Sequence, residues 1–385
     1  MAEFVFDTTP SVRCGAGLSA HIGPVIADEY GSSVMVVTDA GLVSVGLVDQ
    51  AVKSLEKAGV RVVLFDGVVS DPCLDVVNAA RLQAVDESVE VIIGLGGGSC
   101  MDVAKLVAWL VHNNECLGDV TAIDMTKGGR LPLVLIPTTA GTGAEVMPVA
   151  VVAIEGGEKK GLVSRHFLPD LAVLDAKLTL GLPASITAET GMDAIVHAIE
   201  AYTSTSLNNN PISKGHAKGA LELLGGNILA AVKDGSNLEV RTNMLLGSFR
   251  AGQAAANSPL AAVHALCYPI CSRFEAQHGL VNAILLPHVM TFNASVCADD
   301  YTELAVFLFP DLVSVAKERR PALMITRLAD LVSALGLRTQ LRQLDIKREE
   351  LAELALDVMK KTRLLHNNPR PVDEAAALAI YKAAW

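Results

Sequence analysis

The 385-residue sequence has few aromatic residues, scattered cysteines and more acidic than basic side chains. Aromatics make up only 4% of the chain although 51% of its residues are hydrophobic, so alanine, valine and leucine must form most of the core. That hydrophobic share excludes a disordered chain. The formal net charge of −11 argues against a nucleic acid partner, because binding phosphates needs lysine and arginine.

The seven cysteines are odd in number and irregularly spaced, which argues against a disulfide framework and favours a reducing compartment. The first residues lack the basic and then apolar pattern of a signal peptide. Apolar runs such as Leu106–Val111 are far shorter than the roughly 18 residues that a membrane span needs. We therefore expect a cytoplasmic protein that does not bind a membrane.

The first half of the chain alternates short runs rich in valine and isoleucine with helical stretches. Runs that are apolar on both faces are typical of strands in a parallel sheet covered by helices. The predicted strands are Ser33–Thr38, Val60–Phe65, Val89–Leu95, Pro132–Pro137 and Leu171–Leu174, and the predicted helices between them include Val45–Ala58 and Leu74–Asp86. This alternation predicts βαβ units with right-handed crossovers.

The second half of the chain shows helical spacing instead. The predicted helices are Ala184–Thr203, Ile212–Val232, Leu238–Ala255, Leu260–Ser272, Pro321–Leu335 and Arg348–Thr362. A chain of this length suggests two domains. We predict an α/β domain with a parallel sheet over residues 1–180 and an all-α domain over residues 181–385.

Asp39 directly follows the predicted strand Ser33–Thr38. An acidic residue at this end of a strand can bond a ribose 2′-hydroxyl and would repel a 2′-phosphate, which favours NAD over NADP. The alternative is that Asp39 simply caps the next segment.

Two turns of small residues follow later strands. Gly96-Gly97-Gly98-Ser99 leads into a helix containing Asp102, where glycines let the backbone approach a phosphate and the helix start offers free N–H groups. Ser99 with Asp102 resembles a capping box. The second turn, Pro137–Glu145, is rich in threonine and glycine. Two such loops meeting at one crevice indicate a nucleotide site, although each alone could be a turn without a ligand.

Metal-ligand residue types are concentrated in the helical half. Asp193 and His197 are four residues apart and share one face of a helix, His264 lies in another helical stretch, and His278 lies in the loop after it. One carboxylate and three imidazoles suit Fe(II) or zinc. Taken singly, each of these residues is more often structural.

Three further polar residues lie near this set in the sequence. Glu200 is a poorer ligand candidate that supports the ligands or lies at the surface. Cys267 and Cys271 could be ligands, but small buried hydrophobic roles are commoner for such cysteines.

Four motifs in order make the chain resemble the iron-containing (group III) alcohol dehydrogenases over essentially its full length. They are GGGSCMDVAK, IPTTAGTGAEV, GMDAIVHAIEAYTS and HALCYPICSRFEAQHGLVNAILLPHV, and the ending NNPRPVDEAAALAIYKAAW is also similar. The resemblance implies a dinucleotide-binding α/β domain followed by a helical, metal-binding catalytic domain, which is a dehydroquinate synthase-like architecture.

The resemblance also implies roles for individual residues. The four metal ligands would be Asp193, His197, His264 and His278. The residues implied to bind the cofactor are Asp39, Asp71, Pro72, Gly97, Gly98, Ser99, Asp102, Thr138, Thr139, Thr142 and Lys159. The implied cofactors are NAD and one divalent metal, Fe(II) with zinc as the alternative, and the implied assembly is a homodimer or a larger homo-oligomer.

The sequence departs from the family pattern at two positions. Tyr268 stands where members often carry a second histidine that is a candidate proton relay, and a phenol with an ordinary pKa near ~10 is a poorer shuttle. Ala255 stands where a phenylalanine is common, which would widen a substrate pocket.

The expected reaction is hydride transfer between a small, primary alcohol or its aldehyde and a nicotinamide, with the metal acting as a Lewis acid. A diol or a hydroxy acid such as 4-hydroxybutyrate stays open as substrate. The alternatives are a metal-free reductase of the maleylacetate type and a lyase resembling dehydroquinate synthase. The complete Asp–His–His–His set argues against the first, and the Asp193–His197 pair fits the second less well.

Overall fold

The structure is a computed structural model that describes residues 3–113, 128–154 and 159–385. Its contacts divide the chain into two units. The α/β unit is Asp7–Thr139 with Ala144–Leu180, and the helical unit is Gly181–Trp385 with Met1–Phe6 and Ala140–Gly143. The predicted fold class, a parallel-sheet unit followed by a helical one, is confirmed. The assignment of residues 1–180 and 181–385 to two functional domains stays a prediction.

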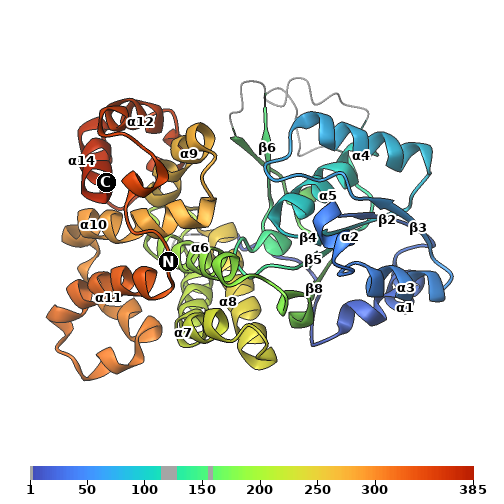
Figure 1. Cartoon of the computed structure of the whole chain (residues 1–385), viewed down its shortest axis with the longest axis horizontal. Coiled ribbons are helices and arrows are strands. Elements are labelled where there is room, and N and C mark those ends of the chain that lie inside the picture. The colour runs from blue at the N-terminus through green and yellow to red at the C-terminus, as the bar shows by residue number, and fades with distance from the viewer. Residues whose placement is uncertain (1–2, 114–127, 155–158) are drawn as a thin grey trace. The chain divides into compact units, whose positions relative to one another are not determined.

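A six-stranded parallel sheet forms the centre of the α/β unit (Figure 1). Its strands, in spatial order, are β1 (Val12–Cys14), β8 (Leu171–Leu174), β5 (Leu133–Pro137), β4 (Val91–Gly96), β2 (Ser33–Val37) and β3 (Arg61–Phe65). The five predicted strands are present within two residues at each end, whereas β1 was not predicted. A separate antiparallel pair, β6 (Val149–Ala153) and β7 (Lys159–Val163), was also missed.

Helices cover both faces of this sheet. They are α1 (Ile22–Glu29), α2 (Ala40–Ser44), α3 (Asp49–Lys57), α4 (Leu74–Asp86) and α5 (Gly98–Leu110). Along β2, Met35 and Val37 pack with α4 and α5, whereas Val34 and Val36 pack with α1 and α3. This alternation follows from the two-residue period of a strand and explains why β2 is apolar on both faces.

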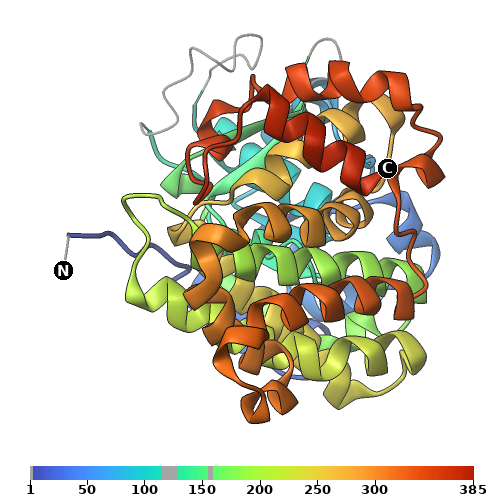
Figure 2. The ribbon, with the colours of Figure 1, turned by 90° about the vertical axis from the view of Figure 1, so that its left-hand side faces the viewer.

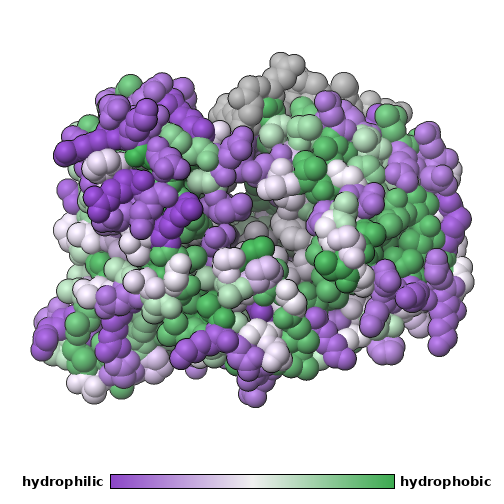
Figure 3. Space-filling model, in the orientation of Figure 1, coloured by the Kyte–Doolittle hydropathy of each residue, from purple (hydrophilic) through white to green (hydrophobic). Residues whose placement is uncertain are grey.

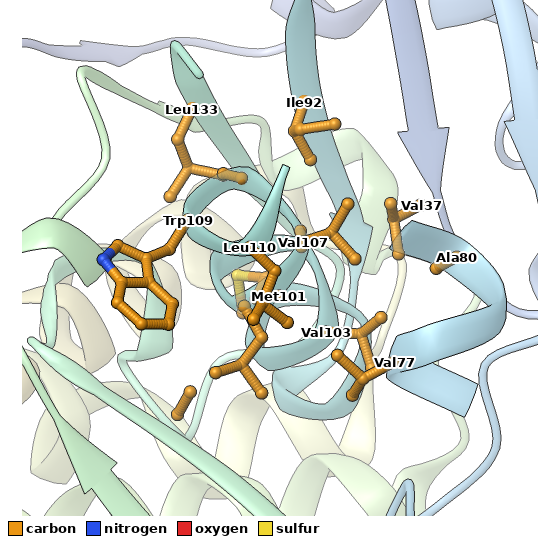
Figure 4. Packing of buried hydrophobic residues seen from close by; sticks show 14 of the residues in the cluster. Val37, Val77, Ala80, Ile92, Met101, Val103, Val107, Trp109, Leu110 and Leu133 are labelled. Carbon is orange, nitrogen blue, oxygen red and sulfur yellow. The ribbon is translucent and has the colours of Figure 1, made fainter. Parts of the chain in front are cut away.

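The helix α5 lies at the centre of one of these two cores (Figure 4). Every residue from Cys100 to Leu110 is buried, including Trp109. Trp109 and Leu110 lie near Leu133 of β5, and Val103 faces Val77 of α4 in the same view. The helix is enclosed on several sides, so most of its residues are apolar, and its two charged residues, Asp102 and Lys105, pair with each other. The predicted helix Val45–Ala58 is shorter in the structure because Gly46 takes a φ of 70° after α2.

The helical unit contains nine α-helices among its described residues, coloured from green to red in Figure 2. They are α6 (Ala184–Thr203), α7 (Pro211–Lys233), α8 (Leu238–Asn257), α9 (Ala262–Phe274), α10 (His278–Leu308), α11 (Arg320–Ala334), α12 (Leu351–Val358), α13 (Thr362–Leu365) and α14 (Glu374–Ala384). The predicted helix Arg348–Thr362 is reduced to α12 after a single 3-10 turn.

The longest helix, α10, was not predicted. Gly279 and Pro287 in its sequence indicate a loop, yet both lie inside the helix. Gly279 is required by packing, because a Cβ there would lie 2.3 Å from the carbonyl oxygen of Glu189. By length and composition α10 could cross a membrane, but 67% of its most apolar window is buried against other helices of this unit. A core helix meets the same criteria, so α10 is weak support for a membrane span.

Candidate metal centre and nucleotide loops

Asp193 and His197 lie on α6, a helix whose residues Gly191–Thr203 are all buried. Their four-residue spacing places both side chains on one face, as predicted. His197 Nε2 lies 3.9 Å from Asp193 Oδ2, and both side chains are almost completely enclosed. The carboxylate is therefore held in the interior of the helical unit, where an isolated charge needs a partner.

Two other helices bring the remaining predicted ligands to the same carboxylate. His264 on α9 places Nε2 3.8 Å from Asp193 Oδ1, and His278 places Nε2 3.9 Å from the same oxygen. The prediction that His278 lies in a loop is wrong, because it is the first residue of α10. Its side chain is 32% exposed, so the cluster is open on the His278 side.

The three histidines do not contribute equally to the cluster. One ligand atom each from Asp193, His264 and His278 lies within 4.8 Å of the others. His197 joins this group through the second oxygen of Asp193, and its ring stacks on that of His264 at 4.9 Å between centroids. The structure thus brings all four predicted ligands together, with His264 and His278 at one oxygen of Asp193 and His197 at the other.

Asn282 is a member of the cluster that sequence reasoning missed. Its Nδ2 lies 2.7 Å from Asp193 Oδ1, 3.2 Å from His264 Nε2 and 3.1 Å from His278 Nε2. The residue is completely buried. A signal was present, because Asn282 follows His278 by four residues and an asparagine in an apolar helical run needs a partner.

The contact of His264 Nδ1 fixes how this imidazole faces the carboxylate of Asp193. Glu200 Oε2 lies 2.6 Å from His264 Nδ1, and Glu200 Oε1 accepts from the Val263 backbone N–H at 2.6 Å. A proton on His264 Nδ1 leaves a lone pair on Nε2, which points into the cluster. Glu200 is therefore buried and hydrogen-bonded to a predicted ligand. This agrees with the interpretation that it supports the ligands, and not with a surface position.

The donor set fits a divalent cation. Tetrahedral ligands at about 2.0–2.2 Å from an ion lie about 3.5 Å apart, close to the separations between Asp193 and the three Nε2 atoms. Within the described residues, His197 Nδ1 and Asn282 Oδ1 are buried without a hydrogen-bond partner. Those two atoms lie on the sides of His197 and Asn282 away from the contacts with Asp193, so the fit to a cation rests on the carboxylate and the three Nε2 atoms.

The electrostatics of the cluster keep its carboxylate charged and its imidazole neutral. Burial raises the pKa of Asp193, but His197, His278, His264 and the Asn282 hydrogen bond outweigh burial and lower it. Burial lowers the pKa of His197 to about 4. An ionised carboxylate and a neutral imidazole are the forms that bind a metal ion.

Tyr268 lies beside this cluster on α9. Its ring centroid is 5.7 Å from that of His278. Burial raises the pKa of Tyr268 far above its usual value, so its phenol stays protonated at neutral pH. Tyr268 is thus a potential hydrogen-bond donor close to the predicted metal ligand His278, and its predicted catalytic role stays a prediction.

In the α/β unit, the strand order reverses direction between β2 and β4. The connections that follow the two strands run to opposite faces of the sheet, and this leaves a crevice at the carboxyl ends of the strands. Asp39 follows β2 and Gly97 follows β4, and Cys100 Sγ lies 3.5 Å from Asp39 Oδ2. The fold therefore places two predicted cofactor residues side by side where such sheets bind ligands.

Asp39 has a structural role at this point as well. Its Oδ1 accepts from the backbone N–H of Leu42 at 2.9 Å and caps α2. The second oxygen, Oδ2, is the one facing Cys100. Both sequence interpretations of Asp39 are therefore compatible with its geometry, since capping uses a single oxygen.

The glycine turn after β4 is formed differently from the prediction. The helix α5 begins at Gly98 with Gly97 as N-cap and without a side-chain cap, so the Ser99–Asp102 capping box is wrong. Asp102 instead accepts from the Val151 backbone N–H and from Lys105 Nζ, at 3.0 and 3.2 Å. These bonds direct its carboxylate to β6 and away from a capping role at the turn.

The other predicted cofactor residues lie in three places. Lys159 Nζ pairs with Asp71 Oδ1 at 2.6 Å, and the carbonyl of Pro72 accepts from Ala153. Thr138 is buried and bonds the Gly96 carbonyl through its backbone, next to Thr139. Thr142 belongs with the helical unit, together with the rest of Ala140–Gly143. Binding of NAD by these residues stays a prediction.

Together, the fold and the cluster are typical of one class of protein: a metal-dependent enzyme with a sheet of the nucleotide-binding type and a helical unit that carries the four predicted metal ligands. Comparison with known proteins identifies the family. A family model for "Iron-containing alcohol dehydrogenase" matches residues 9–176, and one for "Fe-containing alcohol dehydrogenase family, C-terminal" matches residues 187–385.

Individual relatives cover the whole chain. Long-chain-alcohol dehydrogenase 1 of Geobacillus thermodenitrificans is 34% identical, over 100% of this chain and 97% of the relative. A crystal structure of 1,3-propanediol oxidoreductase has a TM-score of 0.95 and 30% identity, covering 100% of both chains. Sulfoacetaldehyde reductase from Bifidobacterium kashiwanohense, solved in complex with NAD+, has a TM-score of 0.89 and 26% identity, covering 100% of this chain and 99% of that one.

The chain belongs to the iron-containing alcohol dehydrogenase family. Both halves match family models, and the relatives cover it from end to end. The resemblance found in the four sequence motifs is confirmed, and the protein is an oxidoreductase.

Proposed function

We propose that this protein is an NAD-linked dehydrogenase that interconverts a small primary alcohol and its aldehyde, using one divalent metal ion, Fe(II) with zinc as the alternative. The observation that carries the proposal is the convergence of three imidazole Nε2 atoms on the buried carboxylate of Asp193. No metal-free reductase needs such a set. The names of relatives that act on alcohols support the reaction class.

The residues proposed to hold the ion are Asp193, His197, His264 and His278. A divalent ion in this position would supply Lewis-acid polarisation of the alcohol or carbonyl oxygen. Glu200 keeps the His264 ring in the orientation that ligation needs. Asn282, which lies one turn after His278 on α10, donates a hydrogen bond to Asp193 Oδ1. These supports fix the ligands before the ion binds, which limits the entropy lost on binding.

The proposed nucleotide site lies at the switch point of the parallel sheet. The start of α5 at Gly98 offers N–H groups to a pyrophosphate, and Asp39 Oδ2, which has only the long 3.5 Å contact with Cys100 Sγ, could also accept from a ribose hydroxyl. NAD bound there would accept or return the hydride. The NAD+ complex of the sulfoacetaldehyde reductase supports this choice of cofactor.

The substrate class is proposed from the names of relatives that act on alcohols and from the exposure of the cluster at His278. Ala255 on α8 is buried, and its small side chain would leave more room than a phenylalanine. We propose small neutral primary alcohols; diols and hydroxy acids such as 4-hydroxybutyrate are the comparison substrates in the test.

A proton must leave the alcohol as the hydride is transferred. Tyr268 is the nearest candidate in sequence terms, but its raised pKa makes it a donor that does not readily ionise. A Tyr268→Phe variant distinguishes a relay from a bystander. An unchanged rate and pH profile would remove Tyr268 from the relay.

The test of the proposed function is NADH formation from a panel of short alcohols, diols and hydroxy acids, before and after chelation. The expected result is activity on short primary alcohols that chelation abolishes and added Fe(II) or zinc restores. NADH-dependent reduction that ignores the chelator would instead support the maleylacetate-type alternative. Turnover without net NADH formation would support the lyase.

Two further proposals concern assembly and location. Figure 3 shows apolar surface in the region of β3 and α4, where Leu64, Leu82 and Val85 are exposed. Exposed apolar side chains on an edge strand and its neighbouring helix favour contact with another chain. We propose a cytoplasmic homo-oligomer, which light scattering of the purified protein at several concentrations would test; a monomer throughout would contradict it.

A further inference from the structure

A second group of ligand-type side chains lies on the other side of His278. Cys267 and Cys271 are four residues apart on α9, and their sulfur atoms lie 3.3 Å from each other. Both side chains are buried, at 0% and 3% exposure. The helical spacing places them on one face, so the pair is held by the backbone of α9.

The third member of this group is the opposite edge of the His278 ring. His278 Nδ1 lies 3.3 Å from Cys267 Sγ and 4.0 Å from Cys271 Sγ. A tetrahedral zinc ion, with bonds of about 2.3 Å to sulfur and about 2.0 Å to nitrogen, holds such atoms about 3.5–3.8 Å apart. The observed separations lie on both sides of that range, so small shifts would suffice to surround one ion.

We propose that Cys267, Cys271 and His278 Nδ1 form a second metal site that binds a soft divalent cation such as zinc or cadmium. The site is distinct from the Asp193 cluster in its chemistry. Two sulfurs and one nitrogen prefer thiophilic ions, whereas a carboxylate with imidazoles suits iron. The His278 ring thus lies between the two sites, with the two sulfur atoms on its Nδ1 side and the carboxylate and other imidazoles on its Nε2 side.

Burial and charge are compatible with this site. Two thiolates and one divalent ion sum to zero charge, so the interior of the helical unit would not have to hold an unpaired charge. Two protons leave the thiols when the ion binds. With the enzyme's own ion on Nε2, the proton on His278 Nδ1 leaves as well, and the ring joins the two ions as an imidazolate. The remaining coordination position would be open or taken by water.

The local structure holds the cysteine helix in place. Tyr381 of α14 donates a hydrogen bond to the carbonyl oxygen of Leu266 at 2.6 Å, directly before Cys267. Both groups are buried. This bond ties α9 to the C-terminal helix, so the two thiols are presented on a fixed element and the binding loses little conformational entropy.

The test is a cadmium titration of the reduced full-length enzyme carrying its own metal, followed by the ultraviolet charge-transfer absorption of cadmium thiolates. Cadmium on the Asp193 cluster gives no such band, because that set contains no sulfur. We expect one tightly bound cadmium per chain with this band. Cys267→Ser and Cys271→Ser should each lower the affinity for this cadmium ion by on the order of tenfold or more, as measured from the band during the titration.

Cys297→Ser is the matched control, because Cys297 is another buried cysteine of the same unit and lies on α10. It should leave the band unchanged. A band that survives both Cys267→Ser and Cys271→Ser, or falls equally in the control, would overturn the second site. Asp193→Ala should remove the enzyme's own metal and keep the cadmium band, so failure of the proposed function is distinguishable.

A wild-type measurement keeps the proposal falsifiable if a serine variant does not fold. Cadmium nuclear magnetic resonance reports the number of sulfur ligands through the chemical shift. Two sulfurs are expected for the bound ion. A shift typical of one sulfur or none would contradict the site.

Discussion

The helical unit and the α/β unit use buried ionisable groups in opposite ways. In the helical unit, Asp193 faces three imidazole Nε2 atoms at 3.8–3.9 Å, and no lysine or arginine pairs with this carboxylate among the described residues. In the α/β unit, Lys105 is completely buried, bonds Asp102 at 3.2 Å and donates to the Val149 carbonyl. The imidazole nitrogens of the helical unit converge on the Asp193 carboxylate. In the α/β unit, by contrast, the Lys105 ammonium donates its hydrogen bonds to Asp102 and to the backbone, so no ligand atoms are left over in this pair.

This difference separates sites made of side chains from sites made of backbone. The proposed metal centre depends on four side chains whose positions are set by three helices. The proposed nucleotide site depends on the backbone at the switch point, at the start of α5 and in the glycine turns. Asp102, which was predicted to bind the cofactor, instead accepts a hydrogen bond from the Val151 backbone. Substitutions of side chains should therefore damage the first site far more than the second.

The largest effect is expected at the centre of the metal cluster. Asp193→Asn keeps the side-chain size but removes the negative charge on which three imidazoles converge. We expect bound metal to be lost and kcat/KM for alcohol to fall about a thousandfold or more, because a Lewis acid contributes several kcal/mol. Metal analysis and steady-state kinetics measure this, with circular dichroism to verify folding. Full metal content in the folded variant would contradict the assignment of Asp193.

A smaller effect, on the pH dependence of stability, is expected from Glu145, a buried carboxyl group of the α/β unit. Burial raises the pKa of Glu145 to about 7 from an ordinary value of 4.5, so the folded chain binds a proton that the unfolded chain has released. Stability is fully present below about pH 4.5 and falls as the pH rises to about 7, by on the order of 2–4 kcal/mol.

Glu145→Gln should remove this pH dependence, since an amide does not titrate. The measurement is the midpoint of thermal unfolding between pH 5 and 7, compared with Glu56→Gln at an exposed site on α3. If the wild type and Glu145→Gln lose stability in parallel over this range, Glu145 is not the group responsible.

The support of His264 should matter less than the ligand itself. Glu200→Gln keeps the shape but replaces the charged acceptor, which lies 2.6 Å from His264 Nδ1. We expect metal affinity to fall about 10–100-fold, with kcat of the fully loaded enzyme changing less. Competition with a chelator of known affinity measures this. Glu303→Gln, on a partly exposed carboxylate bonded to Tyr202, is the control and should bind metal normally.

The smallest effect is expected at the nucleotide loop. Asp39→Asn retains an oxygen to cap α2 at Leu42 but removes the charge that would repel a 2′-phosphate. The ratio of kcat/KM for NADP to that for NAD should rise about tenfold. An Asp39→Ala variant separates capping from charge, since it loses both. An unchanged ratio in Asp39→Asn would leave Asp39 with its capping role alone.

The parallel sheet and the Asp193–His197 pair could be predicted because each depends on a local pattern, whereas His264 and His278 were added by residue type and from the family resemblance, and ligation by all four stays a prediction. Strands such as β2 are apolar on both faces, and the Asp193–His197 spacing is a property of any helix. The edge strand β1 has three residues and alternating exposure, so its apolar signal is too short to detect. The helix α10 was missed because Gly279 and Pro287 have the local signature of a loop.

The contacts that join distant segments could not be predicted. Glu200 meets His264 across 64 residues, and Asn282 meets Asp193 across 89. Nothing in the neighbouring sequence specifies those pairings, which follow from the packing of α6, α9 and α10. The Ser99–Asp102 capping box failed for a similar reason, because β6 supplies a buried N–H that competes for Asp102.

X-ray absorption at the metal edge of the purified enzyme tests the central claim most directly, because it reports which atoms surround the enzyme's own ion. Ligation by Asp193, His197, His264 and His278 predicts a shell of only nitrogen and oxygen at about 2.0–2.2 Å, with the outer scattering of imidazole rings. In enzyme that holds one metal ion per chain, sulfur at about 2.3 Å would place that ion on Cys267 and Cys271 instead and contradict the account, as would a purified, active enzyme without metal.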